Sequence, residues 1–495
     1  MRLQNNLIII SILIFAFLIR LIALNQSLWL DEAIQAWAIQ TYSFKNLVFE
    51  YLKADFNPPL SHILTFVFVK FFGDNEIVLR LPSVLAGVGV VFFSYKILNF
   101  ILAKHKNVDL IYFGILLVSL APLLIFYSQE ARPYSLAVFF STWSMYEFLQ
   151  IMILKNRLLI VHALKYFFAT SLMFWSHYVA WFIWPTQLLL LCLFSYQDKK
   201  ELSNKLKIIF LPLLSIILLL SILFSQLQIG QNTAGSLAVW QNLSTFSLRQ
   251  LALIPTKILI GRLPLDFNLW TLLLLSIPFL LFGFLIIKTI KNKIITSFQS
   301  DTRNDTFYFF FLLAWLVIPV LLGIIVSLKV SVFTYFRFLY LAPAFYLLLI
   351  YCLKDFSVKK MEGIYIIFLV ISAYCSFTYL FNPVFHREDW RSLVEFIKQR
   401  DVSSQVIILS EVSRPFWYYD RDKHQLIDYK EIEQNKLENK IWLIKYSQPI
   451  FEPDNHTEEK LVNNYGYEVV EEKHFQGDLV LKYLVNYKRL FAYEE

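Results

Sequence analysis

Long apolar runs separated by short polar segments follow one another from the start of the chain to about residue 381. A helix needs about 20 predominantly apolar residues to cross roughly 30 Å of hydrocarbon. Runs near this length predict about eleven membrane-spanning helices, at residues 7–24, 81–102, 109–127, 133–153, 160–177, 178–196, 206–226, 269–288, 308–328, 337–354 and 362–381. The chain is therefore expected to be a polytopic α-helical membrane protein.

One further apolar segment, PPLSHILTFVFVKFFG at 58–73, is shorter than the others. A helix of about 14 residues would be only about 21 Å long, which is too short to span comfortably. Pro58 and Pro59 suit the start of such a helix, because their missing N–H groups would have no helical partner there. We expect this segment to lie at the outer membrane surface or to dip into it.

The positive charges of the loops predict the orientation. If 58–73 does not cross, the loops on one side are all rich in Lys or Arg, at 103–107, 154–157, 197–207, 288–305 and 354–360. The segments on the other side carry few positive charges for their length, at 127–135, 176–178, 227–268, 329–337 and in the tail. The positive-inside rule then predicts a multi-pass cell-membrane protein with a cytoplasmic N-terminus and an extracytoplasmic C-terminus.

Apolar density falls after about Phe381, and the pattern changes to short alternating elements. Strands are predicted at 404–412, 439–448 and 477–485, and helices at 389–400 and 456–466. This pattern predicts a small extracytoplasmic α/β domain at 385–495, after a transmembrane domain at 1–384 whose first outer loop is 25–80. The tail contains no Gly-rich phosphate loop and no nucleophile elbow.

Composition supports the membrane class and excludes others. Apolar residues make up 57% of the chain and charged residues 17%. The formal charge of +8 does not indicate nucleic acid, because the excess Lys lies in short loops and forms no basic stripe with interleaved aromatics. The three cysteines lie inside apolar runs, so neither a disulfide framework nor a zinc site is predicted.

Two adjacent carboxylates, Asp31 and Glu32, follow the first apolar run in LNQSLWLDEAIQAWAIQ at 24–40. Apolar residues at helical spacing predict an amphipathic helix in the interface, with Trp29 and Trp37 as aromatic anchors. In one explanation Asp31 is the N-cap of this helix and Glu32 is stabilised by the helix dipole. In another, the carboxylates take part in chemistry at the membrane–water boundary. The two explanations are compatible.

The predicted topology gathers further polar residues on the outer side. They are Asn57, His62, Glu130, Arg132, His177 and Arg337. Each has a structural alternative, such as a helix start at Pro133 or a snorkelling arginine. Together, carboxylates and arginines at this boundary suit a substrate with a lipid tail and an anionic head. Arg binds phosphate bidentately and keeps its charge, and a nearby carboxylate can accept a proton from a hydroxyl.

The order of several motifs resembles the GT-C superfamily of membrane glycosyltransferases. These motifs are LWLDEAIQAWA, FNPPLSHILTFVFVKFFGDNEIVLRLPSVLAG, APLLIFYSQEARPYSLAV, FWSHYVAW and YFRFLYLAPAF. The branch that they resemble contains protein O-mannosyltransferases and lipid A aminoarabinose transferases, and the resemblance covers roughly residues 1 to 350. The combination of an acidic pair, a double proline, RLPS and QEARPY is more specific than any one of its parts.

The resemblance implies an inverting glycosyltransferase that uses a polyprenyl-phosphate sugar on the outer face. It implies Asp31 as general base, Glu32 as its support, and Arg132 and Arg337 near the lipid phosphate. The sequence departs from many relatives at Asn57, where a His or another polar residue is common, and its tail matches no acceptor class. The acceptor hydroxyl therefore stays open between a glycan, a lipid and a protein.

No metal ligand set and no cofactor are predicted from the residues, although the resemblance is compatible with a divalent ion that bridges carboxylate and phosphate. Two other functions stay open. A transporter or lipid flippase would need ionisable residues near the bilayer midplane, and often interrupted helix pairs in two related halves. The pattern shows neither, and Lys165, the deepest charge that we identify, is expected to snorkel to the inside. A structural or partner-binding membrane protein would use the acidic pair only as a helix cap.

Overall fold

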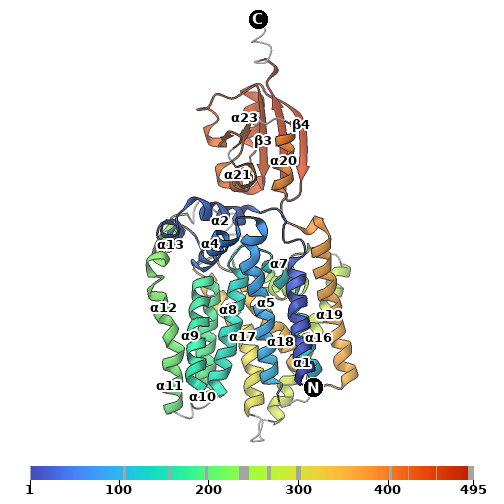
Figure 1. Cartoon of the computed structure of the whole chain (residues 1–495). Helices are drawn as coiled ribbons and strands as arrows, with labels where there is room; N and C mark the ends of the chain where they lie inside the picture. Colours follow the sequence, from blue (N-terminus) through green and yellow to red (C-terminus); the bar gives the residue numbers. More distant parts are fainter. Residues whose placement is uncertain are drawn as a thin grey trace. The chain divides into compact units, whose positions relative to one another are not determined.

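A computed structural model describes residues 2–103, 108–153, 158–195, 199–233, 245–264, 269–296, 303–400, 404–421, 423–452 and 454–488 (Figure 1). Several Lys- or Arg-rich loops used for the orientation lie partly outside these residues, at 104–107, 154–157, 196–198 and 297–302. The described chain forms two compact units. The first comprises 1–24, 44–73 and 80–382, and the second comprises 25–43, 74–79 and 383–495.

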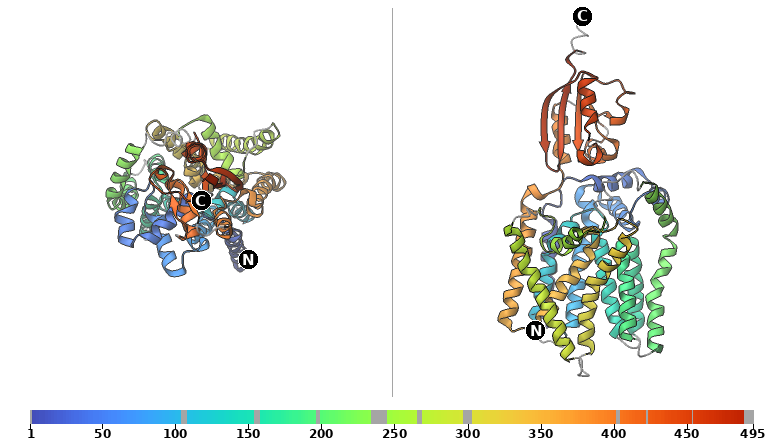
Figure 2. Two further views of the ribbon diagram at one scale, coloured as in Figure 1. Left: turned by 90° about the horizontal axis from the view of Figure 1, so that it is seen from above. Right: turned by 180° about the vertical axis from the view of Figure 1, so that it is seen from behind.

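The first unit is a helical bundle whose long helices run side by side (Figures 1 and 2). Its α-helices are α1 Arg2–Leu21, α3 Phe44–Phe49, α4 Leu60–Phe72, α5 Glu76–Ile101, α6 Val108–Ser119, α7 Pro122–Ser128, α8 Tyr134–Ile153, α9 Leu158–Ser176, α10 Ile183–Ser195, α11 Lys199–Phe210, α12 Leu214–Ile217, α13 Leu220–Thr233, α15 Leu248–Ile260, α16 Leu269–Thr296, α17 Arg303–Ser327, α18 Ala342–Leu353 and α19 Val358–Phe381. Its short 3-10 helices are η1 Tyr51–Lys53, η2 Tyr178–Phe182, η3 Leu211–Leu213 and η5 Tyr335–Leu341.

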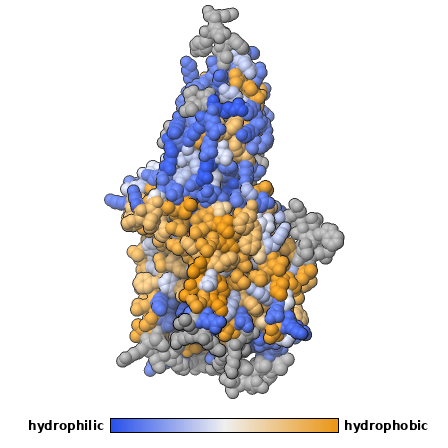
Figure 3. Space-filling model, turned by 45° about the vertical axis from the view of Figure 1, so that its right-hand side comes forward, coloured by the Kyte–Doolittle hydropathy of each residue, from blue (hydrophilic) through white to orange (hydrophobic). Residues whose placement is uncertain are grey.

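Nine of the described helices are long and apolar enough to cross a membrane, or eleven if each of two bent helix pairs is one span. Apolar side chains cover much of the outside of this unit (Figure 3), as expected of helices that face lipid. The predicted polytopic helical fold is confirmed. The segment 58–73 forms α4, a helix of 13 residues that is shorter than the spanning helices.

The bend between α6 and α7 is fixed by side chains from two other helices. The chain turns by 51° there, because Pro122 at the start of α7 has no N–H to continue α6. The carbonyl of Ser119 accepts a bond from the Arg20 guanidinium at 3.3 Å, and the carbonyl of Leu120 accepts one from Ser376 Oγ at 2.7 Å. Carbonyls that lose their helical partner inside a membrane need other donors. Arg20 and Ser376 supply these donors at the break.

Arg20 is a fully buried cation of α1 that we did not identify as deep from the sequence pattern. Besides Ser119, it donates to the carbonyl of Ala16 at 2.8 Å and to Ser128 Oγ at 3.1 Å. Gln129, just after α7, donates to the carbonyls of Arg20 and Ile22. The end of α1 and the end of α7 are therefore bonded together, and the polar segment 129–133 begins from a fixed point.

The second unit contains a mixed five-stranded sheet in the order β2-β1-β3-β5-β4. Its strands are β1 Gln405–Ile407, β2 Leu426–Ile427, β3 Lys440–Tyr446, β4 Glu468–Phe475 and β5 Leu479–Val485. Its helices are α2 Leu30–Thr41, α20 Trp390–Arg400, α21 Arg414–Asp420, α22 Gln448–Phe451 and α23 His456–Asn463, with 3-10 turns η6 Pro383–Phe385, η7 Ser410–Val412 and η8 Tyr429–Glu431.

The sheet of the second unit has an apolar cluster on each face. Trp442 and Ile444 of β3 belong to one cluster with α20, and Ile441 and Leu443 belong to the other, as the two-residue period of a strand requires. The C-terminal α/β character predicted from the sequence is confirmed. The short strand β2 and the edge strand β4 were not predicted.

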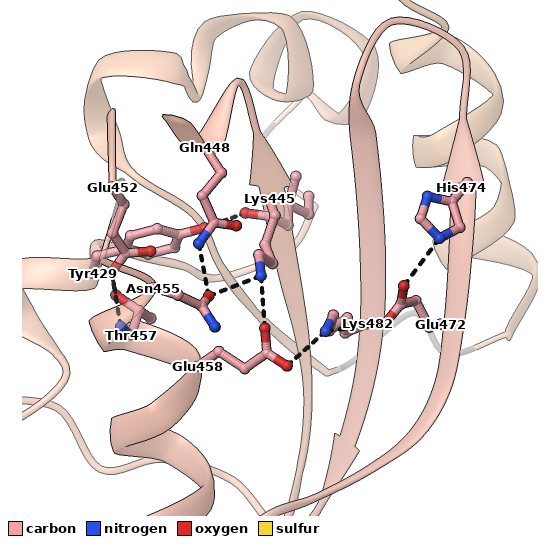
Figure 4. A network of polar contacts seen from close by, with 11 residues as sticks. Tyr429, Lys445, Gln448, Glu452, Asn455, Thr457, Glu458, Glu472, His474 and Lys482 are labelled. Atoms are coloured by element: carbon pink, nitrogen blue, oxygen red, sulfur yellow. Dashed lines mark hydrogen bonds and ion pairs between the residues drawn. The ribbon is translucent and has the colours of Figure 1, made fainter. Parts of the chain in front are cut away.

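A network of charged side chains connects α23 with strands of this sheet (Figure 4). Lys445 of β3 and Lys482 of β5 both donate to Glu458 of α23, at 2.7 and 2.6 Å. Lys482 also contacts Glu472 of the edge strand β4 at 3.0 Å. These contacts bind α23 to β3 and β5 and join β5 to β4.

Candidate active site

The predicted residues of the first unit lie around the segment 129–133, which joins α7 to α8. Gln129, Glu130 and Ala131 are almost completely buried, with 1%, 1% and 2% exposed. Ser83 of α5 donates to the carbonyl of Arg132 at 3.4 Å. The bond to the backbone carbonyl of Arg132 and the bonds of the Gln129 side chain therefore fix the segment that carries Arg132.

Arg132 and Arg337 lie close enough to His177 for both guanidinium charges to act on its imidazole. His177 lies between two spanning helices and is 6% exposed. Burial, and then the two arginines, lower the pKa of His177 from 6.5 to about 3. The imidazole is therefore neutral at physiological pH, and the arginines carry the positive charge at this position.

His177 also has the local structural role that the sequence left open. Its Nδ1 accepts a bond from the backbone N–H of Val179 at 3.2 Å, which caps η2. Its ring lies 5.6 Å from that of Tyr134, at the start of α8. The ring of Phe336 lies 5.5 Å from the same tyrosine. Aromatic contacts thus bring the start of α8 and η5 together, and η5 carries Arg337.

His62 of α4 belongs to the same surroundings, because the charge of Arg132 also acts on it. It is 2% exposed, and its Nε2 lies 3.5 Å from the Asp55 carboxylate. Burial, first, and then Arg132 lower its pKa to about 4, although Asp55 acts in the opposite direction. The structure therefore brings together four predicted residues of this unit, His62, Arg132, His177 and Arg337.

Asn57 lies on the loop before α4, and its carbonyl accepts a bond from Gln226 of α13 at 3.1 Å. The same amide donates to the carbonyl of Leu52 at 2.6 Å, and Gln226 accepts from the Tyr178 hydroxyl at 2.6 Å. The loop that precedes α4 is thus bound to α13 through one glutamine side chain.

Arg262 is a cation of this unit that the sequence reasoning missed. Its guanidinium lies 5.0 Å from the ring centroid of Phe126 and within electrostatic reach of Tyr127. Glu130 and Tyr134 also act on Tyr127, so Arg262 shares neighbours with the predicted residues. It lies in the predicted outer segment 227–268, whose polar residues offered the signal that could have found it.

Asp31 and Glu32 belong to the second unit. They are the second and third residues of α2, whose N-cap is Trp29, and Trp29 makes no capping bond through its side chain. The alternative in which Asp31 is the N-cap is therefore wrong. The Glu32 side chain is fully buried, and its Oε2 lies 3.8 Å from Nε of Arg387. Asp31 acts electrostatically on Tyr446 of β3.

The face of α2 that carries Trp37 packs against α21 within the second unit. The guanidinium of Arg414, from α21, lies 3.8 Å from the centroid of the Trp37 ring. This is the distance of a close cation–π contact. The amphipathic pattern of α2 thus reflects packing on α21 in addition to the interfacial role expected of Trp37.

No group of three or more His, Cys, Asp or Glu side chains among the described residues could hold a metal ion.

The two buried histidines predict how stability depends on pH. The unfolded chain protonates them near pH 6.5, whereas the folded protein does so only near pH 4 for His62 and pH 3 for His177. The unfolded state therefore binds more protons below pH 6.5, and stability falls as the pH drops from 6.5 towards 4. At about 1.4 kcal/mol per pKa unit, each histidine should account for a loss on the order of 1–3 kcal/mol.

Thermal unfolding of the detergent-solubilised protein between pH 7 and pH 4 measures this effect. His62→Gln should make the decline shallower, and His474→Gln, which changes a side chain that is 72% exposed, should leave it unchanged. An equally steep decline in His62→Gln would show that this histidine is not buried in its neutral form.

The chain was compared with family models, with curated proteins and with solved structures. No family model matches the sequence, and no curated protein matches it. Among solved structures, the chain is similar to ArnT from Cupriavidus metallidurans in the apo state, with 12% identity and a TM-score of 0.55 over 96% of this chain and 97% of that one. It is also similar to the apo oligosaccharyltransferase from Archaeoglobus fulgidus, with 13% identity and a TM-score of 0.52 over 89% of this chain and 70% of that one.

A third similar structure is AglB, the oligosaccharyltransferase from Archaeoglobus fulgidus, in complex with an inhibitory peptide and a dolichol-phosphate. The identity is 11% and the TM-score 0.54, over 89% of this chain and 69% of that one. At these identities the likeness concerns the course of the chain, and it extends over nearly the whole molecule.

Proposed function

We propose that this chain, which has the GT-C fold of these membrane glycosyltransferases, transfers a sugar from a polyprenyl-phosphate donor to an acceptor hydroxyl. The observation that supports the proposal is that the charges of Arg132 and Arg337 both act on one buried, neutral histidine of the first unit, His177. Two guanidinium groups without a histidine charge beside them suit one lipid phosphate.

In the proposed reaction, a carboxylate takes the proton of the acceptor hydroxyl while the oxygen attacks the anomeric carbon in line. The bond between that carbon and the phosphate oxygen breaks, so the configuration inverts and polyprenyl phosphate leaves. Asp31 is the proposed base and Glu32 its support. Arg132 and Arg337 are proposed to hold the phosphate, whose charge they compensate before and after the transfer.

The nature of the donor is supported by a solved relative of the fold. AglB, to which the chain is similar, was solved with a dolichol-phosphate. A polyprenyl phosphate in the same class is therefore our proposed leaving group. The acceptor is proposed only as a hydroxyl of a glycan, a lipid or a protein, because the described residues of the second unit show no feature that distinguishes these three.

Transfer of a labelled sugar from synthetic polyprenyl-phosphate donors by the purified protein tests the proposal. Appearance of label in an acceptor, with release of polyprenyl phosphate, would support it. Movement of the intact donor across vesicles without cleavage would instead favour the alternative, a transporter or lipid flippase.

One hydrogen-bonded pair inside the helical bundle bears on that alternative. Glu147 of α8 is 2% exposed in its side chain, and its Oε2 lies 2.5 Å from Nδ1 of His162 on α9. The other oxygen of Glu147 accepts from the Trp143 indole at 2.9 Å. We identified only Lys165 as a deep charge from the sequence and overlooked Glu147. Because both Glu147 oxygens are bonded, the pair is explained as a link between two helices.

We also propose the orientation predicted from the loops, with the N-terminus cytoplasmic and the tail outside. An enzyme that is active only outside the cytoplasm, fused to Glu495, should be active in intact cells. A fusion that is expressed and membrane-bound but inactive would show that α4 spans the membrane and that the tail lies inside.

A further inference from the structure

The buried ion pair of the second unit joins the acidic pair to the residues that follow the last spanning helix. Glu32 is completely buried on α2, and the Arg387 side chain, from the segment before α20, is 4% exposed. Their charged groups approach to 3.8 Å. A buried carboxylate is unfavourable unless an opposite charge compensates it, so this arginine has a defined electrostatic task.

The loop that leads into α2 is bonded to the same part of the chain. The Gln26 side chain accepts from the backbone N–H of Arg387 at 3.2 Å, and Ser27 Oγ accepts from that of Arg391 at 3.3 Å. The Tyr419 hydroxyl of α21 accepts from the backbone N–H of Leu28 at 2.8 Å. Residues of the C-terminal part therefore hold both the loop that leads into α2 and the carboxylate of Glu32, the third residue of this helix.

Two adjacent carboxylates would repel each other if neither were compensated. Two like charges at one site disfavour the ionised form of at least one partner. Arg387 compensates Glu32, the fully buried member of the pair, whereas Asp31 acts on the Tyr446 phenol. Burial, and then Glu388 and Asp31, raise the pKa of Tyr446, which therefore stays protonated and donates to Glu388 at 3.0 Å.

We propose that Arg387 is a positioning residue that compensates the buried Glu32 carboxylate and so lets the neighbouring Asp31 carboxylate act as the proton acceptor. This inference rests on the proposed function, in which Asp31 is the base. It gives the C-terminal part of the chain a task in the chemistry of the acidic pair. The charged and titratable groups that act on this part of α2 are Glu32, Arg387, Glu388, Tyr446 and, across Trp37, Arg414.

The test compares full-length Arg387→Met, Glu32→Gln and the double variant in transfer assays across pH. In Arg387→Met the acidic limb of the pH–rate profile should move to higher pH, by about one unit, because Asp31 then lies beside an uncompensated anion. In Glu32→Gln the limb should move the opposite way, since the arginine loses its partner. The double variant has neither charge and should return towards the wild-type profile.

Arg400→Ala is the matched control. Arg400 also pairs with a glutamate of the second unit, Glu471, but it is 57% exposed and should leave the profile unchanged. An acidic limb that does not move in Arg387→Met, or that stays displaced in the double variant, would overturn the proposal. If Arg387→Met does not fold, folding of the double variant supports the charge pairing, and misfolding of both contradicts it.

Thermal unfolding of the wild type, the two single variants and the double variant separates this inference from the proposed function, since unfolding needs no substrate. Single changes that each lower Tm, with a double variant more stable than their sum predicts, would show coupling between Glu32 and Arg387. A coupled pair in a protein that transfers no sugar would defeat the proposed function alone. An active protein without coupling would defeat the inference alone.

Discussion

Asp31→Asn should reduce sugar transfer by about 10²–10⁴-fold while the protein stays folded and still binds its donor. The carboxylate is the proposed general base, and positioned general bases contribute about this factor to rate. Asparagine preserves the shape of the side chain and removes the proton acceptor together with its charge. The measurement is the rate of transfer from a purified polyprenyl-phosphate sugar at matched protein concentration.

The position of Asp31 makes the result easier to interpret. It is the second residue of α2 and not its N-cap, and the amide oxygen of asparagine can still accept a hydrogen bond. Loss of a charge near a helix N-terminus costs about 0.3–1 kcal/mol of stability, which thermal unfolding would register separately. Asp109→Asn, in the first turn of α6, controls for that cost. Near-normal turnover in Asp31→Asn would leave Asp31 with a structural role only.

Arg337→Ala should weaken donor binding and turnover together, by about 10- to 100-fold in kcat/KM. A hydrogen bond to a charged group is worth about 1.5–3 kcal/mol, and about 1.4 kcal/mol corresponds to a factor of ten. The phosphate carries its charge both before and after the transfer, so ground-state binding should suffer as well as the rate. Arg337 also donates to the carbonyl of Ser331 at 2.8 Å, which orients its guanidinium.

Titration of the purified protein with a non-transferable polyprenyl phosphate, beside steady-state kinetics, checks this prediction. Arg337→Lys keeps the charge without the planar fork and should fall between wild type and Arg337→Ala. Lys329→Ala, which changes an exposed cation of the same segment at 329–337, is the control. Unchanged affinity in Arg337→Ala would remove this arginine from the proposed phosphate site.

Hydrophobic pattern alone determined the membrane part of the fold. Run length against bilayer thickness separated the spanning helices from α4, because a helix of 13 residues is shorter than the hydrocarbon it would have to cross. The same pattern could not predict the 51° break at Pro122 in detail. The carbonyls freed there are satisfied by Arg20 and Ser376, which lie far from it in sequence.

For the candidate site, the sequence determined which kinds of residue lie near the ends of the helices, and the resemblance implied a role for several of them. Only the tertiary structure decided which of them share surroundings. It brought Arg132 and Arg337 to His177 and left that histidine neutral, because burial and two cations act on it together. It also paired Glu32 with Arg387, across more than 350 positions of chain. Such partners are invisible in local spacing, since a buried charge is compensated by whichever opposite charge the fold brings near.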